Sequence, residues 1–327
     1  MKPSPIVVAL MWIGLNGSAS DDAVAQGAGA YPERPIRVVV PFPPGGGIDN
    51  MARHTAQRLG EALSTQLIVD NRSGAGGAIG TEHVARASPD GYTLLFSSTS
   101  PMSINPHINK FAYDPVASFT AIGMVASSPQ MLVVPPSLPV QSVKELIALA
   151  KSRPGALSFA SSGVGTIIHV AAEMFAQRAG IELLHVPYKG AAPAVVETMT
   201  GQVTMLVAAY SSVATQVRAG KLRALAVTSR QRMALAPAIP TVSESGLPDF
   251  ESIQWWAVSG PAGLPAAIVD RLNSALNATL KSEDVKKRFA AEGAEPGGGT
   301  PAELAAFIKR DYDKWGAVIK AVGIKAQ

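Results

Sequence analysis

The sequence predicts an α/β protein with parallel sheet and helices on both faces. Strands rich in β-branched residues alternate with amphipathic helical stretches through the first hundred residues after the N-terminal segment. Two separate strands each run into a small-residue turn that opens a helix. The chain has 327 residues, 47% apolar and 16% charged, which suffices for two α/β domains with a large core.

The first 25 residues are predicted to be a secretory signal peptide. Lys2 supplies a positive start, residues 6–15 form an apolar run, and residues 23–25 read Ala-Val-Ala, a small-residue cleavage pattern. The apolar run is too short for a membrane anchor, and no later stretch is long enough either. We therefore expect an exported protein.

The first strand is expected at residues 36–40, the turn at 41–47 and a helix at 48–63. Prolines end the strand because they cannot donate to a sheet ladder, and three glycines then expose bare backbone. The free N–H groups at such a helix start bind an anion, usually a carboxylate or a phosphate. The alternative is that residues 41–47 form only a tight turn. The second turn described below favours the anion site.

The next units are a strand at 66–70, a helix at 79–87 and a strand at 92–96. The glycine run 74–80 resembles a dinucleotide motif, but it follows the second strand rather than the first. It also lacks the acidic residue expected at the end of a strand about 20 residues later. We interpret these glycines as a helix start or a packing site.

The middle of the chain repeats the first arrangement. A strand at 157–160 leads into Ser-Ser-Gly-Val-Gly-Thr at 161–166, and a helix then runs to about residue 179. Strands are also expected at 131–134, 182–186, 202–207, 223–227 and 255–259. The remaining helices are expected at 143–150, from within 187–193 to about 200, and at 211–219, 265–280, 283–292 and 301–322.

Composition excludes several classes of function. There is no cysteine, and the histidines show no metal-ligand spacing, so no metal or other cofactor is expected. The net charge is +4, and the basic clusters are not interleaved with aromatic residues, which argues against nucleic acid as a partner. No G-x-S-x-G motif occurs, and Ser161 and Ser162 lack an obvious neighbouring base, so no catalytic residue is assigned.

Several segments together resemble the substrate-binding proteins of tripartite tricarboxylate transporters, the Bug family. The resemblance covers nearly the whole mature chain in order. It rests on Tyr31-Pro-Glu-Arg-Pro-Ile-Arg37, Pro41-Phe42-Pro43-Pro44-Gly45-Gly46, Asp70-Asn71-Arg72-Ser73-Gly74-Ala75-Gly76-Gly77, Pro89-Asp90-Gly91-Tyr92-Thr93-Leu94, Val186-Pro187-Tyr188-Lys189-Gly190, residues 220–227 and Pro240-Thr241-Val242.

The resemblance implies a periplasmic-binding-protein-like fold of type II, with two α/β domains joined by two crossing strands around a ligand cleft. Domain one would comprise residues 31–128 and 253–327, and domain two residues 129–252, with crossings near 127–131 and 253–258. It further implies a monomeric, non-enzymatic receptor that closes on a small carboxylate and passes it to the membrane subunits of a transporter. A sensor that presents the ligand to a signalling protein and, less favoured, a carboxylate-processing enzyme remain alternatives.

The two turns are expected to grip the ligand carboxylates, largely through backbone N–H groups. The predicted ligand-binding residues are Phe42, Pro43, Gly45, Gly46, Gly47, Asp49, Ser98, Ser161, Ser162, Gly163, Gly165, Thr166, Tyr188, Gly190, Ala191 and Ala208. Four roles stay open, and one of them is whether Tyr210 touches the ligand. Asp49 either caps its helix or meets a ligand amine, Lys189 either pairs with a carboxylate or is solvated, and Trp256 either packs in the core or forms the cleft wall.

One segment departs from the family pattern. After residues 201–203 the family usually continues with Phe-Asp and then a proline, whereas this chain has Val207-Ala-Ala-Tyr210-Ser. The change removes an acidic group and is expected to place a phenol near the cleft. We take it as a hypothesis that the ligand lacks an amino group and has more apolar or aromatic surface.

Overall fold

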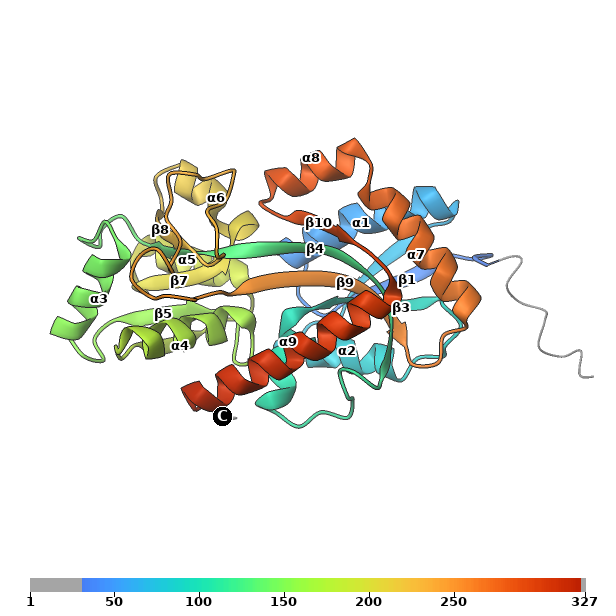
Figure 1. Cartoon of the computed structure of the whole chain (residues 1–327), viewed down its shortest axis with the longest axis horizontal. Helices are drawn as coiled ribbons and strands as arrows, with labels where there is room; N and C mark the ends of the chain where they lie inside the picture. Colours follow the sequence, from blue (N-terminus) through green and yellow to red (C-terminus); the bar gives the residue numbers. More distant parts are fainter. Residues whose placement is uncertain (1–30, 325–327) are drawn as a thin grey trace, which may run out of the picture. The chain divides into compact units, whose positions relative to one another are not determined.

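Strand β4 (Phe119–Val134) runs through the whole sheet and takes part in both of its halves. Its residues up to Pro129 pair antiparallel with β9 (Ile253–Pro261), in the half that we call sheet A. Its last residues pair antiparallel with β7 (Met205–Ala209) and β8 (Arg223–Val227), in the half that we call sheet B. Figure 1 shows β4 and β9 lying side by side across the centre of the computed structural model. The structure describes residues 31–324, and all elements below lie in the unit that begins at Pro32.

Sheet A carries the first βαβ units. Strand β1 pairs in parallel with both neighbours, so its carboxyl end and theirs lie at the same edge. Strand β3 then pairs antiparallel with β9. The further strands of sheet A are β1 (Ile36–Val40), β2 (Leu67–Asn71), β3 (Thr93–Ser98) and β10 (Glu295–Gly298), and its helices are α1 (Gly47–Leu63), α2 (Ala78–Ala85), α7 (Ala266–Leu280) and α8 (Glu283–Ala291).

Sheet B repeats this plan with the middle of the chain. Strand β5 pairs in parallel with β6 and β7, so the turns that follow these three strands share one edge. The further strands of sheet B are β5 (Ser158–Ser161) and β6 (Leu184–Pro187), and its helices are α3 (Val143–Ser152), α4 (Ile167–Ala179), α5 (Ala191–Thr200) and α6 (Tyr210–Arg218). The prediction of an α/β periplasmic-binding-protein-like fold is confirmed by the solved relatives reported below.

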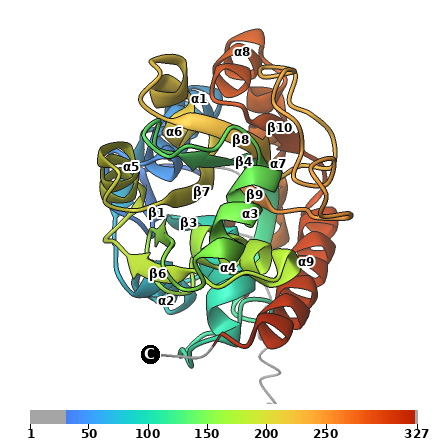
Figure 2. The ribbon, with the colours of Figure 1, turned by 90° about the vertical axis from the view of Figure 1, so that its left-hand side faces the viewer.

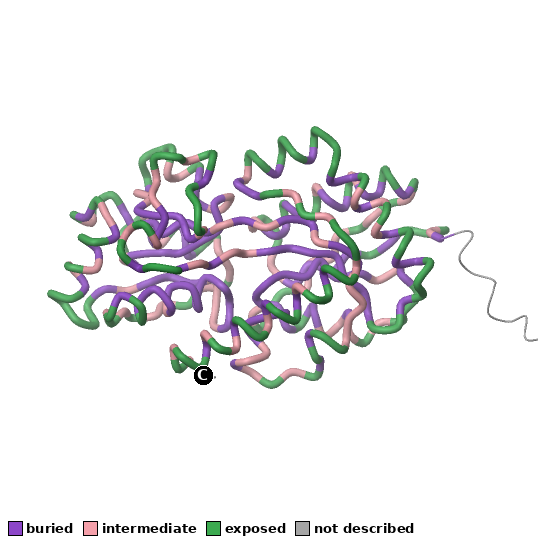
Figure 3. The backbone as a smooth tube through the Cα atoms, viewed as in Figure 1, coloured by how far each residue is buried: buried purple, intermediate pink, exposed green. Residues whose placement is uncertain are grey.

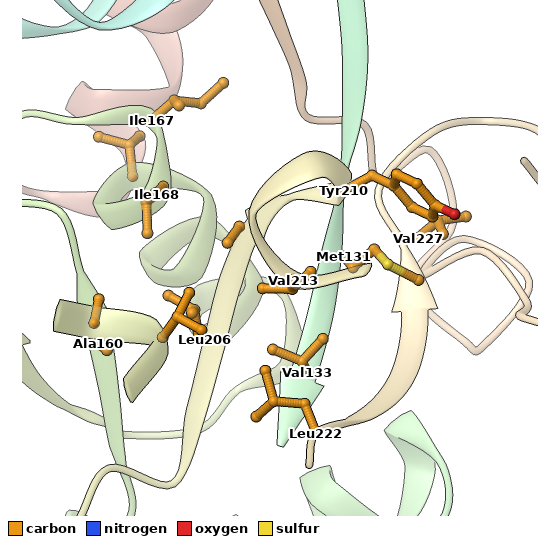
Figure 4. Packing of buried hydrophobic residues seen from close by; sticks show 14 of the residues in the cluster. Met131, Val133, Ala160, Ile167, Ile168, Leu206, Tyr210, Val213, Leu222 and Val227 are labelled. Carbon is orange, nitrogen blue, oxygen red and sulfur yellow. The ribbon is translucent and has the colours of Figure 1, made fainter. Parts of the chain in front are cut away.

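The core lies between the strands and the inner faces of the helices. Figure 3 shows that β4 and β9 are largely buried, whereas exposed residues follow the outer helix faces. One apolar cluster joins β4, β7 and the starts of α4 and α6, and Figure 4 shows Tyr210 of this cluster beside Met131 and Val227. The apolar stripes of the helices are therefore used for packing on the sheet.

Three polar side chains connect β4 to the segments on either side of it. The N–H of Gln130 donates to Thr228 Oγ1 at 2.7 Å, and this hydroxyl donates to the carbonyl of Ser252 at 2.6 Å. Ser252 Oγ in turn donates to Gln130 Oε1 at 2.6 Å. All three residues are buried. The place where the chain passes between sheets A and B is thus fixed by hydrogen bonds as well as by strand pairing.

Helix α9 (Pro301–Val322) packs on both halves of the sheet. Leu304 and Ile308 belong to a cluster with sheet A, while Trp315 and Ile319 join the cluster of sheet B. Figure 2 shows the helix beside α4, and Gln177 of α4 donates from Nε2 to the carbonyl of Ala321 at 3.1 Å. The helix begins with the capping box expected from Thr300 and Glu303.

A buried carboxylate fixes α9 against β9. The indole Nε1–H of Trp255 donates to Asp311 Oδ2 at 2.7 Å, and Asp311 is only 9% exposed. Burial raises the pKa of Asp311, and the hydrogen bond from Trp255 offsets part of that rise.

Several element predictions needed correction. The strand expected at 131–134 is the end of β4, which begins at Phe119. Strand β10 was missed, because its sequence Glu-Pro-Gly-Gly contains no β-branched or aromatic residue. The polar stretch after β3 continues as a helical turn, Ser100–Ile104. The predicted signal peptide lies outside the described residues, and no helix within residues 31–324 is long and apolar enough to cross a membrane.

Two substitutions test the role of Asp311. Asp311→Asn should keep the bond from Trp255, since an amide oxygen still accepts. Asp311→Leu should leave the indole N–H buried without a partner, at a cost of about 1–3 kcal/mol in the free energy of unfolding. Urea unfolding of both variants and the wild type measures the difference, and equal stabilities would contradict the assignment.

The pH dependence gives a second check. Because the folded-state pKa of Asp311 is raised, its contribution is complete below the unfolded-state pKa and is lost as pH rises through the folded-state pKa. The stability of Asp311→Asn relative to the wild type should therefore increase as pH rises above about 4, the unfolded-state value. A difference that stays constant over this range would show that Asp311 does not titrate as described.

Candidate functional site

A cavity of about 220 Å³ lies where the carboxyl ends of strands from sheets A and B meet. Segments that follow β1, β3, β5, β6 and β7 contribute to its wall, and β9 contributes two side chains. This volume is below the roughly 300–1,000 Å³ typical of sites for drug-sized ligands, so the site suits a small molecule. The lining residues are Phe42, Pro43, Pro44, Gly46, Gly47, Ile48, Ser100, Ser162, Ile167, Ile168, Lys189, Gly190, Ala191, Ala192, Pro193, Ala209, Ser212, Gln254 and Trp256.

Four helices begin at this cavity. The first residues of α1, α4, α5 and α6, or the residues beside them, all lie in its wall. The N–H groups of Gly47 and Ile48 in the first turn of α1 have no hydrogen-bond partner among the described residues. Each helix start carries about half a positive charge. The wall is therefore electropositive through its backbone, which favours an anionic ligand.

The first turn is held from behind by Asp49. Its Oδ2 accepts from the N–H of Gly45 at 2.9 Å and from Arg53 Nε at 3.0 Å, while Oδ1 accepts from Asn71 Nδ2 at 2.9 Å. Burial alone would raise the pKa of Asp49, but these three hydrogen bonds outweigh it and the pKa is lowered. Asp49 is 2% exposed and does not line the cavity, which matches its role as a helix-start residue.

The second turn is organised by glycine and threonine. Gly163 and Gly165 have φ of 124° and 75°, a region that residues with a side chain rarely adopt. Thr166 caps α4, since its Oγ1 accepts from the N–H of His169 at 3.4 Å. Ser162 is the member of the turn that reaches the cavity wall.

The two sides of the cavity touch each other. The N–H of Ile167 at the start of α4 donates to Ser100 Oγ after β3, at 3.0 Å. A Cβ placed on Gly47 of α1 would lie 2.9 Å from Ser211 Oγ and 3.4 Å from Ser212 Oγ of α6. The start of α6 therefore lies beside the start of α1.

The expectation that Ser161 has no neighbouring base was wrong. Ser161 Oγ lies 2.6 Å from His185 Nε2, and the His185 ring stacks on His169 with 4.1 Å between ring centroids. The two residues are 24 positions apart, so local sequence could not reveal the pair. Ser161 is fully buried, and its hydroxyl also accepts from the N–H of Gly163 at 3.1 Å. The pair lies behind the second turn rather than in the cavity wall.

Burial governs the protonation of this histidine pair. Burial lowers the pKa of His169 to about 3, helped by the nearby His185, and lowers that of His185 to about 4. The N–H of Gly165 donates to His169 Nδ1 at 3.4 Å, which requires that nitrogen to be unprotonated. Both rings are thus neutral supports of the second turn.

The structure divides the predicted binding residues into two groups. In the cavity wall lie Phe42, Pro43, Gly46, Gly47, Ser162, Gly190 and Ala191. Outside the wall lie Gly45, Asp49, Ser98, Ser161, Gly163, Gly165, Thr166, Tyr188 and Ala208. Of the residues whose roles were left open, Lys189 and Trp256 also belong to the wall. Most members of the second group shape the turns that the first group presents.

Two predicted residues, Ser98 and Ala208, lie close in sequence to residues of the cavity wall but not in the wall itself. Ser98 is the last residue of β3 and pairs opposite Trp256, whereas the helical turn that follows brings Ser100 to the wall. Ala208 points into the core and Ala209 lines the cavity, as alternation along a strand requires. Ile167, Ile168 and Gln254 were missed because nothing in the local sequence distinguishes them from core or surface residues.

The expected position of Tyr210 was also wrong. Its ring is buried in the sheet B cluster and contacts Gly293, where an added Cβ would lie 2.4 Å from the ring. Its hydroxyl accepts from Arg218 Nη1 at 3.3 Å. Tyr210 is the first residue of α6, and Figure 4 shows its ring beside Met131 of β4. It is not one of the residues that line the cavity.

Comparison with known proteins identifies the family of this chain. Residues 51–324 match the model of the tripartite tricarboxylate transporter family receptor. The chain is 39% identical to Protein BugT of Bordetella pertussis over 96% of this chain and 97% of that protein.

Two solved structures of Rhodopseudomonas palustris proteins are similar in fold. Rpa4515 with adipate has a TM-score of 0.88 at 35% identity, covering 91% of this chain and all of that one. MatC with bound malate has a TM-score of 0.84 at 28% identity, covering 88% of this chain and all of that one. On the family model and these relatives, the chain belongs to the tripartite tricarboxylate transporter family of solute-binding receptors.

Proposed function

We propose that this protein is an exported, periplasmic receptor that captures a small carboxylate in the cavity described above and delivers it to the membrane subunits of a transporter. The observation that carries the proposal is the convergence of four helix starts on one small cavity. Two related receptors have been solved with adipate and with malate, which supports a carboxylate as the ligand class. The receptor binds its ligand and does not convert it.

The binding energy comes mainly from backbone donors. Each hydrogen bond from an N–H group to a charged carboxylate contributes roughly 1.5–3 kcal/mol. Micromolar affinity corresponds to about 8 kcal/mol, so a few such bonds suffice after the cost of association is included. Among the residues outside the wall, we assign Gly45, Gly163, Gly165 and Thr166 to shaping the two grips.

Capture proceeds by closure of two domains. Residues 31–128 and 253–327 form the first and residues 129–252 the second, with the ends of β4 and β9 as the crossings. The contact between Ile167 and Ser100 forms when the walls approach and is broken on opening. The protein acts as a monomer. Presentation of the ligand to a membrane signalling protein is the alternative use of the same closed form.

Thermal stability tests the ligand class. Adipate, malate and a tricarboxylate such as citrate should be added separately to the mature protein. A ligand that binds only the folded state raises Tm in proportion to the logarithm of its concentration, with a gain of about 2.7 kcal/mol at one hundred times Kd. Sodium chloride at equal ionic strength is the control. No shift with any mono-, di- or tricarboxylate would refute the proposed function.

A substitution of Gly46 tests the location of the grip. Gly46 lines the cavity with φ of −83°, and a Cβ there would have its nearest neighbour, the carbonyl of Pro43, at 4.0 Å. Gly46→Leu should therefore fold, with a capping loss of about 0.5–1 kcal/mol, and weaken carboxylate binding at least tenfold by filling the site. Gly46→Ala is the matched control with the smaller side chain. Calorimetry that finds unchanged affinity in Gly46→Leu would place the grip elsewhere.

The histidine pair offers a test against a hydrolytic role. A base for Ser161 would have to titrate near neutral pH, whereas a neutral structural pair titrates only far below it. Because the folded-state pKa of His169 is lowered to about 3, the stability that it contributes is lost as pH falls from about 6.5, the unfolded value, toward 3.

Replacing His169 should flatten that dependence. His169→Asn should reduce the slope of unfolding free energy against pH between about 6 and 4 by up to 1.4 kcal/mol per pH unit. Urea unfolding at four pH values measures the slope. An unchanged slope would mean that His169 titrates in the folded protein and would contradict its role as a neutral support of the second turn.

A further inference from the structure

Among the described residues, the cavity wall contains one charged side chain and no carboxylate. Lys189 is the charged residue, and none of the other lining residues is acidic. The remaining polar side chains of the wall are those of Ser100, Ser162, Ser212 and Gln254, all of them neutral. The lysine and the helix starts therefore both favour a negatively charged ligand group, and none of the lining side chains named above favours a positively charged one.

Asp49, the acidic residue closest in sequence to the wall residues Gly47 and Ile48, already has hydrogen-bond partners on both of its oxygens. Asp49 follows Ile48 of the wall, but its two oxygens accept three hydrogen bonds, from Gly45, Arg53 and Asn71. Its side chain is almost completely buried, and its lowered pKa shows that these partners stabilise the charged form. Rotating Asp49 toward a ligand would break all three bonds and release the turn that presents Gly46 and Gly47.

A ligand ammonium group would therefore be buried without a counter-charge. Taking an ion out of water is costly unless an opposite charge and hydrogen bonds replace the water. Ser212 Oγ and Gln254 Oε1 are neutral acceptors, which replace only part of the hydration. Burying a ligand ammonium group in this cavity therefore costs free energy, and the two neutral acceptors offset only part of that cost.

The rest of the wall is apolar. Ile167 and Ile168 lie at the start of α4, and the ring of Phe42 lies on the opposite side of the cavity, in the turn after β1. Trp256 of β9 is 1% exposed, and its indole Nε1–H has no hydrogen-bond partner among the described residues. The apolar side chains of the wall favour a ligand body that is apolar apart from its acid groups.

We propose that the cavity selects carboxylic acids that have an apolar body and no amino group, and that it discriminates against the α-amino counterparts of the same acids. The proposal rests on the proposed function, since it concerns the same cavity. It does not depend on Tyr210, whose phenol lies in the core. The selecting feature is the absence of a free carboxylate beside four helix starts.

Calorimetry on matched acids tests the proposal. Adipate should be compared with 2-hydroxyadipate and 2-aminoadipate, and 3-phenylpropionate with phenylalanine and its 2-hydroxy analogue. The hydroxy acids have nearly the size of the amino acids but no positive charge. We expect each amino acid to bind at least tenfold more weakly than its hydroxy analogue. Equal affinity within each pair would overturn the inference and leave the proposed function standing, whereas no binding of any acid would overturn both.

A gain of amine binding is the sharper test. Ser212 lies in the wall in the first turn of α6, where an acidic residue is compatible with the helix. Ser212→Asp supplies the missing counter-charge, and Ser212→Asn is the control of equal size without charge. The ratio of 2-aminoadipate to 2-hydroxyadipate affinity should rise at least tenfold in Ser212→Asp and not in Ser212→Asn. The same ratio in both variants would contradict the proposal.

Discussion

The participation of β4 in both sheets is the constraint on which the site depends. Strand β4 hydrogen-bonds with β9 in sheet A and with β7 and β8 in sheet B, so it joins the two sets of parallel strands directly. Their carboxyl ends then face the same space, and each contributes a turn and a helix start to it. The hydrogen bonds among Gln130, Thr228 and Ser252 fix the chain at the point of passage. Helix α9, which packs on both sheets, limits how far they can separate.

The parts of the site that sequence predicts well are those with local causes. Prolines and glycines ended β1 and opened α1 for reasons of backbone geometry that hold in any fold. The turn 161–166 was predicted by the same chemistry, with Thr166 as a cap. The family resemblance added the arrangement of the two halves, which single elements do not determine. Together these observations located both turns that form the cavity.

The parts that sequence could not predict depend on distant contacts. His185 supports Ser161 across two neighbouring parallel strands, and no local spacing encodes that pairing. Ser100 rather than Ser98 reaches the wall because a helical turn follows β3, and polar residues give little indication of such a turn. Ile167 and Ile168 look like ordinary core residues, and only the cavity at the start of α4 gives them a second role. Tyr210 was expected near the cleft, but its ring is buried beside Gly293.

The charge that attracts the ligand comes mostly from the peptide backbone, and a peptide group has no pKa in the physiological range. Helix starts keep their partial charge at every pH at which the fold is intact. The acid closest to the grip, Asp49, has its pKa held low, and the histidines behind the second turn stay neutral. The charge of the binding site therefore changes little with the pH of the surroundings. What changes with pH is the ionisation of the solute, so capture follows the fraction of the acid that carries its charge.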